Sequence, residues 1–180
     1  TMVQASVLGG GSSVNAMIYI RGVPSDYARW EELGASGWNY GDVLPYFLRS
    51  EDNNRFCNEA HAVGGPLGVS DIDNIHPLTR AWLQACQQAG LPYNHDFNSG
   101  DQAGSGLYQI TARNGLRSSA ATAFLKPARR RPNLQVRTRA RVSRIIVEQG
   151  RATGVEYFVN GRRWVLHAER EVILSAGAIS

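Results

Sequence analysis

The stretch SVLGGGSSVNAMIYIRG, from Ser6 to Gly22, places three consecutive glycines and two serines directly before an apolar segment. Glycine loses more conformational freedom on folding than any other residue, so a run of three predicts a place where another group approaches the backbone closely. Exposed backbone N–H groups and hydroxyls together bind phosphate oxygens well. Asn15 adds an amide that can both donate and accept a hydrogen bond.

The spacing within this loop excludes two common nucleotide-binding motifs. A P-loop ends in Gly-Lys-Ser/Thr, which is absent here. Gly9 and Gly11 fit the first two glycines of G-x-G-x-x-G, but Val14 stands where the third glycine belongs. Two interpretations therefore stay open: a site for a phosphate or cofactor, and a tight turn between packed elements.

The elements around this loop indicate an α/β protein with a mixed, α+β character. Apolar spacing and end signals predict helices over residues 25–34, 40–52, 76–91 and from Ser118 onward. Ser25 or Asp26 is the expected cap of the first helix, and Pro45 is expected in the first turn of the second. Short strands are expected over 67–70 and 107–113. Five more strand-like segments follow in the last 47 residues, at 133–138, 140–150, 152–161, 162–169 and 170–177. Two hairpin turns join the middle three segments. The continuous apolar run at 171–178 suits a parallel strand buried on both faces.

Charge and composition limit which binding partners and cellular locations the sequence predicts. The net charge is +4, and residues 125–144 hold eight basic residues and no acidic one. The arginines of that segment largely alternate with other residues, and no aromatic side chain lies among them to stack on bases, so we expect no nucleic acid. Cys57 and Cys86 lack metal-ligand spacing, which predicts free thiols in a reducing, cytoplasmic compartment. No run approaches the ~20 apolar residues of a transmembrane segment. A signal peptide or peripheral membrane attachment stays open.

The loop sequence LGGGSSVNAMIYIRG resembles the first signature of the glucose-methanol-choline (GMC) oxidoreductase family. Four further segments are similar to that family in the same order: WNYGDVLPYF, DFNSGDQAGSGLYQIT, RNGLRSSAATAFLKPARRRPNLQV and EVILSAGAIS. The resemblance covers essentially all 180 residues. Its last segment is similar to the opening of the family's second signature, and we therefore expect an internal fragment of a longer enzyme.

The resemblance implies an FAD-dependent enzyme that oxidises a primary or secondary alcohol by passing a hydride to the flavin N5. It implies part of a Rossmann-like FAD-binding domain, residues 1–61 and 118–180, around part of an inserted substrate-binding sheet domain, residues 62–117. The expected cofactor-binding residues are Gly10, Gly11, Ser12, Asn15, Ala16, Met17, Val142 and Ala176, the last together with Gly177. Val142 would act through its backbone against the adenine, and Met17 is equally well interpreted as a core residue.

The resemblance also implies what this chain does not supply. Some relatives tether FAD through a histidine at the position of Val14, so we expect FAD to be bound non-covalently. The catalytic histidine of the family lies beyond these residues, and we assign no catalytic role to any of the four histidines. Tyr108 and Gln109 could line the substrate cavity, although ordinary sheet positions explain them better.

Three functions stay open on this evidence. The first is the redox enzyme acting on a small-molecule alcohol, with O2 or a quinone or cytochrome as electron acceptor. The second is a non-redox lyase, similar to hydroxynitrile lyases, on the same scaffold. The third is a truncated, non-catalytic FAD-binding module. Alone, the 180 residues are expected to be inactive and to bind FAD weakly.

Overall fold

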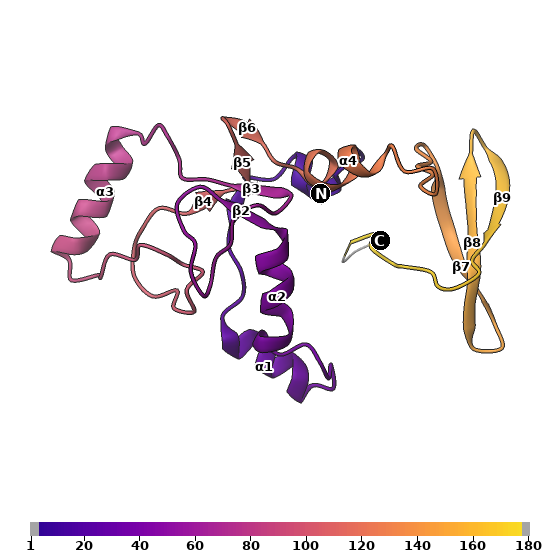
Figure 1. Cartoon of the computed structure of the whole chain (residues 1–180), viewed down its shortest axis with the longest axis horizontal. Helices are drawn as coiled ribbons and strands as arrows, with labels where there is room; N and C mark the ends of the chain where they lie inside the picture. The colour runs from indigo at the N-terminus through magenta and orange to yellow at the C-terminus, as the bar shows by residue number, and fades with distance from the viewer. Residues whose placement is uncertain (1–3, 178–180) are drawn as a thin grey trace. The chain divides into compact units, whose positions relative to one another are not determined.

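The computed structural model describes residues 4–177 and divides into two compact units, Thr1–Arg130 and Arg131–Ser180. Each unit is described by itself (Figure 1). The first mixes helices with short strands, and the second is a three-stranded sheet. The mixed helix and strand content predicted from the sequence is confirmed.

The first unit opens with the glycine loop, which forms a short 3-10 helix, η1 (Gly10–Ser13), followed by β1 (Ile18–Tyr19). Two helices come next, α1 (Pro24–Glu32) and α2 (Tyr40–Ser50). The predicted caps of α1 are wrong, because Val23 occupies the cap position and Asp26 Oδ2 accepts from its N–H at 3.0 Å. Pro45 lies in the second turn of α2 rather than the first, since that helix already begins at Tyr40.

The remainder of the first unit is built from paired short strands and one long helix. β2 (Glu51–Asn53) pairs in parallel with β3 (Leu67–Val69), and β4 (Gln109–Ile110) pairs antiparallel with β1. Between β3 and β4 stands α3 (Pro77–Gln88), as the sequence predicts. A hairpin of β5 (Ala112–Arg113) and β6 (Leu116–Arg117) leads to η2 (Ala121–Leu125) and α4 (Lys126–Ala128).

The predicted continuous strand over 107–113 is wrong, because Thr111 interrupts it. The N–H of Thr111 donates to Met17 O at 2.8 Å, and its carbonyl accepts from Ser118 N at 2.9 Å. Thr111 therefore joins the residue after the glycine loop to the residue after the β5–β6 hairpin. The same contacts bring the glycine loop and the start of η2 together, although they lie about a hundred residues apart in sequence.

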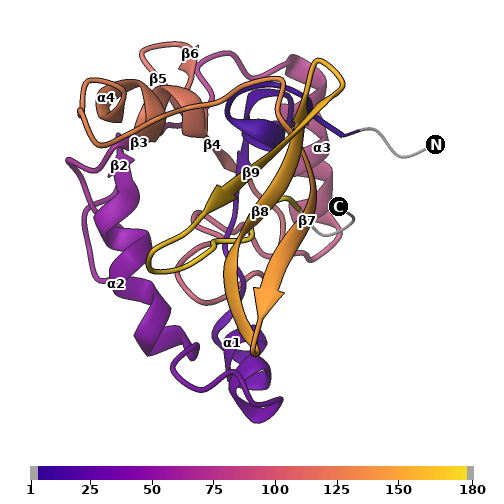
Figure 2. The same cartoon turned by 90° about the vertical axis from the view of Figure 1, so that its right-hand side faces the viewer.

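The second unit is an antiparallel ribbon in the order β7–β8–β9, formed by β7 (Arg141–Glu148), β8 (Arg151–Val159) and β9 (Arg162–His167) (Figure 2). Both predicted hairpin turns are confirmed. Their residue pairs, Gln149–Gly150 and Asn160–Gly161, all have positive φ, as two-residue turns of this kind require.

The expectations of strands at 133–138 and 171–178 are wrong for the residues that the structure describes. Residues 171–177 form no strand, and Ile173 and Leu174 are 78% and 70% exposed. A strand buried on both faces forms only against neighbouring strands and covering elements. Within residues 4–177 no strand pairs with this segment, so its apolar pattern finds no sheet to join.

Candidate cofactor-binding site

The glycines of the loop have different roles. Gly9 has φ +90°, and a Cβ there would collide with Ser13 Oγ and lie 3.1 Å from both N and Cβ of Ala121 in η2. Gly9 is thus required by the packing of the chain against itself. A Cβ at Gly10 or Gly11 would meet no atom within 4 Å. The tight-turn interpretation therefore explains Gly9, while the backbone of Gly10 and Gly11 is open to a ligand.

The two serine hydroxyls are committed to the loop itself. Ser12 Oγ donates to Gly9 O at 2.5 Å and accepts from Ala120 N at 2.9 Å, and Ser13 Oγ donates to Leu8 O at 2.8 Å. Each hydroxyl has one proton to donate, and in both serines a backbone carbonyl receives it. In this structure both protons are therefore committed to the loop, and a contact of these hydroxyls with a phosphate stays a prediction. The predicted contact of FAD with the Ser12 backbone stays a prediction.

Asn15 is fixed by an arginine from a distant part of the chain. Its Oδ1 accepts from Arg117 Nη1 at 2.7 Å and from Met17 N at 3.1 Å, and Arg117 Nη1 also reaches Ser12 O at 3.1 Å. Sequence reasoning missed Arg117, because nothing in RNGLRSS indicates contact with a loop 102 residues away. The side chain of Asn15 is exposed, and Arg117 is half-buried at the end of β6.

Met17 lies where the loop turns into β1. Its φ of +64° is in the left-handed region, which costs a non-glycine residue roughly 1–2 kcal/mol. Its carbonyl, however, accepts from Thr111 N, which holds this conformation in place. Met17 is half-buried and Ala16 is exposed. The core and cofactor interpretations of Met17 therefore both stay open.

The other two predicted cofactor residues belong to the second unit. Val142 lies on β7, pairs with Tyr157 of β8 and is 56% exposed. Ala176 and Gly177 follow β9 in irregular backbone, and Gly177 has φ +105°. The expectation that they end a strand is wrong here. Their contact with the dinucleotide stays a prediction.

A buried cluster of charged and polar side chains lies next to β1. We call it the Glu51 cluster, and it consists of Arg21, Glu51, Asn53, His61 and Asp96. Glu51 is fully buried, with Oε2 2.8 Å from Arg21 Nη2 and Oε1 2.8 Å from His61 Nδ1. The second ring nitrogen of His61 lies 3.0 Å from Asp96 Oδ2, and Asn53 donates to Glu51 Oε1 at 2.8 Å. Burial raises the pKa of Glu51, but hydrogen bonds from His61 and Asn53 and the charge of Arg21 outweigh it and hold the pKa below its usual value.

The structure accounts for three residues whose roles the sequence left open. His61, one of the four histidines, lies in a loop, is 2% exposed and joins two acidic side chains. Gln109 is buried, exchanges hydrogen bonds with Asn53 at 2.8 and 3.1 Å and donates to Asp71 at 2.9 Å, so it ties β4 to β2. Tyr108 is 38% exposed, and its ring packs 4.7 Å from that of Phe97.

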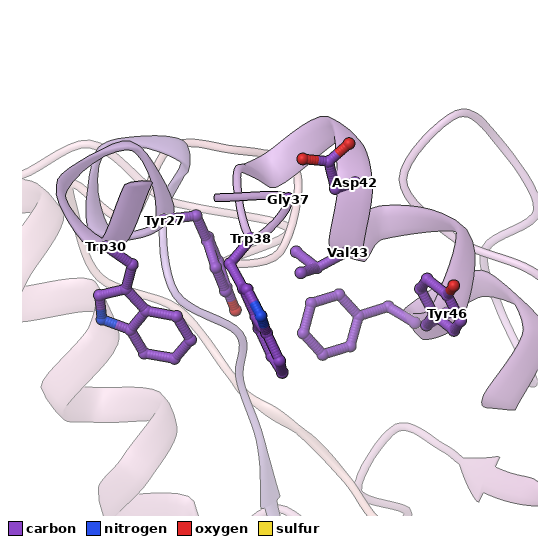
Figure 3. A pocket seen from close by; sticks show the side chains of 8 residues that line it. Tyr27, Trp30, Gly37, Trp38, Asp42, Val43 and Tyr46 are labelled. Atoms are coloured by element: carbon purple, nitrogen blue, oxygen red, sulfur yellow. The ribbon is translucent and has the colours of Figure 1, made fainter. Parts of the chain in front are cut away.

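An aromatic pocket of about 610 Å³ lies between α1 and α2 (Figure 3). Tyr27 is its buried centre, with ring centroids 5.3 Å from Trp30 and 6.2 Å from Phe47. The residues that line it are Tyr27, Trp30, Gly37, Trp38, Asp42, Val43, Tyr46 and Phe47. None of the predicted cofactor residues is among them. Residues 4–177 contain no cluster of acidic, histidine or cysteine side chains that could hold a metal ion.

Comparison with known proteins decides the family. The family model described as GMC oxidoreductase matches residues 1–180. The chain belongs to the GMC oxidoreductase family. It is 46% identical over 174 residues to the mitochondrial choline dehydrogenase of Mus musculus, covering 97% of this chain and 29% of that protein. It is 46% identical over all 180 residues to the oxygen-dependent choline dehydrogenase of Rhizobium johnstonii, covering 33% of that protein.

Solved structures agree with the fold of this GMC chain. The pyridoxine 4-oxidase from Mesorbium loti aligns with a TM-score of 0.84 at 32% identity, covering 91% of this chain and 33% of that one. An FAD-dependent oxidoreductase from Chaetomium thermophilum aligns with a TM-score of 0.87 at 28% identity, covering 93% and 32%. The GMC chain thus spans about a third of the length of the relatives it matches. The resemblance and the partial FAD-binding fold expected from the sequence are confirmed. No helix within residues 4–177 is long and apolar enough to cross a bilayer.

Proposed function

We propose that the protein carrying this chain is an FAD-dependent oxidoreductase that oxidises the CH–OH group of a small alcohol, and that residues 10–17 lie against the FAD. The observation that carries the proposal is the open backbone of Gly10 and Gly11 beside Asn15, in a chain that matches the family over its whole length. When bound, FAD supplies the acceptor for the hydride that leaves the alcohol carbon.

The residues present fit an anionic dinucleotide. The open side of Gly10 and Gly11 lets a flat or extended group approach the backbone without meeting a side chain. Arg117 brings a positive charge to the same loop, and an arginine favours phosphate and other electron-rich oxygens. Ser12 and Ser13 stiffen the loop through their own hydrogen bonds. The role proposed for this chain is therefore to bind and orient FAD. The proton-accepting histidine that the family resemblance implies is proposed to lie elsewhere in the protein.

Several finer assignments belong to the same proposal. Choline is the first alcohol to test, because the curated relatives at 43–46% identity carry that name. FAD is proposed to be non-covalent, since Val14 offers no atom for a tether. Residues 1–61 and 118–180 are proposed to belong to the FAD-binding domain and 62–117 to the substrate side. The free thiols Cys57 and Cys86 fit the proposed cytoplasmic location.

The test uses the complete gene product, purified with the cofactor it holds. We expect a yellow protein whose flavin is released into the supernatant on acid precipitation and is bleached by choline or another alcohol without oxygen. Flavin retained in the acid pellet contradicts non-covalent binding. Flavin that no alcohol bleaches favours the lyase alternative, and a protein that neither contains nor binds FAD contradicts the proposal altogether.

A further inference from the structure

The side-chain amide of Asn15 has only one orientation that its neighbours allow. Oδ1 accepts from two donors, Arg117 Nη1 at 2.7 Å and Met17 N at 3.1 Å. Rotating the amide by 180° would place its NH2 group against these two donors, and both hydrogen bonds would be lost. Within residues 4–177, no acceptor lies within hydrogen-bond distance of Nδ2, and the side chain is exposed. The amide therefore presents its two N–H donors outward.

Arg117 is well placed to impose this orientation. It pairs with Ala112 in the β5–β6 hairpin, and the next residue, Ser118, is buried and accepts from Gly68 N at 3.0 Å. The guanidinium thus projects from an anchored backbone. Among the described residues, no carboxylate lies within ion-pair distance of it; its contacts are the neutral oxygens of Asn15 and Ser12. A charge at this position strengthens the hydrogen bond it donates.

We propose that Arg117 is a positioning residue of the FAD site, which acts by holding Asn15 so that its amide NH2 donates to an acceptor atom of FAD. The inference rests on the proposed function. It settles which half of the Asn15 amide faces the cofactor, a choice that the sequence leaves open. It also explains why a polar loop residue is tied to a strand end 102 residues away.

The key variant is Asn15→Asp, tested in the complete gene product. A carboxylate keeps an acceptor for Arg117 and for Met17 N, so the loop stays as it is. The outward NH2, however, becomes an oxygen that repels FAD acceptors. We expect the FAD dissociation constant, measured by titrating apoprotein with FAD and following flavin fluorescence, to rise about tenfold or more. The apoprotein should melt at or above the wild-type temperature.

Arg117→Met, Asn15→Ala and the double variant then test the coupling. Each single change should raise the FAD dissociation constant about tenfold, and the double variant should rise no further than the larger single. Arg113→Met is the matched control, because Arg113 lies in the same hairpin but pairs with Asp52 at 2.7 Å instead of the loop. Its affinity for FAD should equal that of the wild type.

Two results would overturn the inference: wild-type affinity in Arg117→Met or Asn15→Asp, or effects of the two single changes that multiply fully in the double variant. In the second case Arg117 would act on FAD independently of Asn15. A wild-type protein that binds no FAD would instead refute the proposed function, so the two failures are distinguishable. Melting of each apoprotein separates a loss of affinity from a loss of folding.

Discussion

Gly11 offers a direct test of whether a cofactor lies on the glycine loop, because this position is open in the chain itself. A Cβ at Gly11 meets nothing within 4 Å, and its backbone is outside the left-handed region. The change Gly11→Val should therefore leave the free energy of unfolding of the apoprotein within about 1 kcal/mol of wild type. If FAD lies against this backbone, the added side chain overpacks the contact. Overpacking typically costs about 1–3 kcal/mol, which corresponds to a dissociation constant for FAD roughly five- to 150-fold higher.

The matched variant is Gly9→Ala, for which we expect the apoprotein itself to lose stability. A Cβ at Gly9 collides with Ser13 Oγ, crowds Ala121 and stands on a residue with φ +90°. The left-handed backbone alone costs roughly 1–2 kcal/mol, so the apoprotein of this variant should unfold more easily. The measurements are denaturant unfolding of both apoproteins and titration with FAD, all in the complete gene product. Wild-type FAD affinity in Gly11→Val would refute the placement of FAD on residues 10–17.

Three further predictions concern stability. The lowered pKa of Glu51 implies stability that is present above the unfolded value of 4.5 and is lost as pH falls through the lower native value. In Glu51→Gln, acid unfolding followed by circular dichroism should therefore lose part of this pH dependence. The same change removes one partner of the buried pairs and should lower the free energy of unfolding by about 3–5 kcal/mol at neutral pH. Tyr27→Ala should lower the free energy of unfolding, measured with denaturant, by about 3 kcal/mol, because a buried ring is removed. Tyr46 is 63% exposed, so Tyr46→Ala should change the free energy of unfolding by no more than about 0.5 kcal/mol. Equal losses in the two variants would contradict the assigned core. Gly161→Ala should lower the melting temperature of the β8–β9 hairpin region, since φ +76° there disfavours alanine by roughly 1–2 kcal/mol, and an unchanged melting curve would argue against this turn.

Local signals made some of the fold readable from the sequence. Helix α3 begins at Pro77 and is followed by Gly90 with φ +88°. Proline at a helix start and glycine after a helix end are signals that can be recognised in the sequence. The turns at Gln149–Gly150 and Asn160–Gly161 are equally local. The break at Thr111 was not readable, because it depends on hydrogen bonds to Met17 and Ser118 that only the tertiary fold creates.

In the candidate site, too, the sequence identified local features but not those that depend on tertiary contacts. Glycine spacing identified the loop, but it could not say that Gly9 serves packing while Gly10 and Gly11 stay open. That distinction depends on the approach of Ala121 from η2. The partners of the serine hydroxyls were not readable for a related reason. Both hydroxyls donate to carbonyls of the loop, and a hydroxyl that could bind phosphate is indistinguishable in sequence from one that closes a turn.

The Glu51 cluster and the glycine loop are parts of one construction around β1. Arg21, two residues beyond this strand, is buried by its contacts with Glu51 and Tyr19, and its N–H donates to Asn98 at 2.7 Å. At the other end of β1, the carbonyl of Met17 is held by Thr111. A short strand of two residues has few ladder bonds of its own, so its position depends on these anchors at both ends. Arg21, through the Glu51 cluster and Asn98, and Thr111 thus hold the two ends of the strand that directly follows Asn15 and the open glycines.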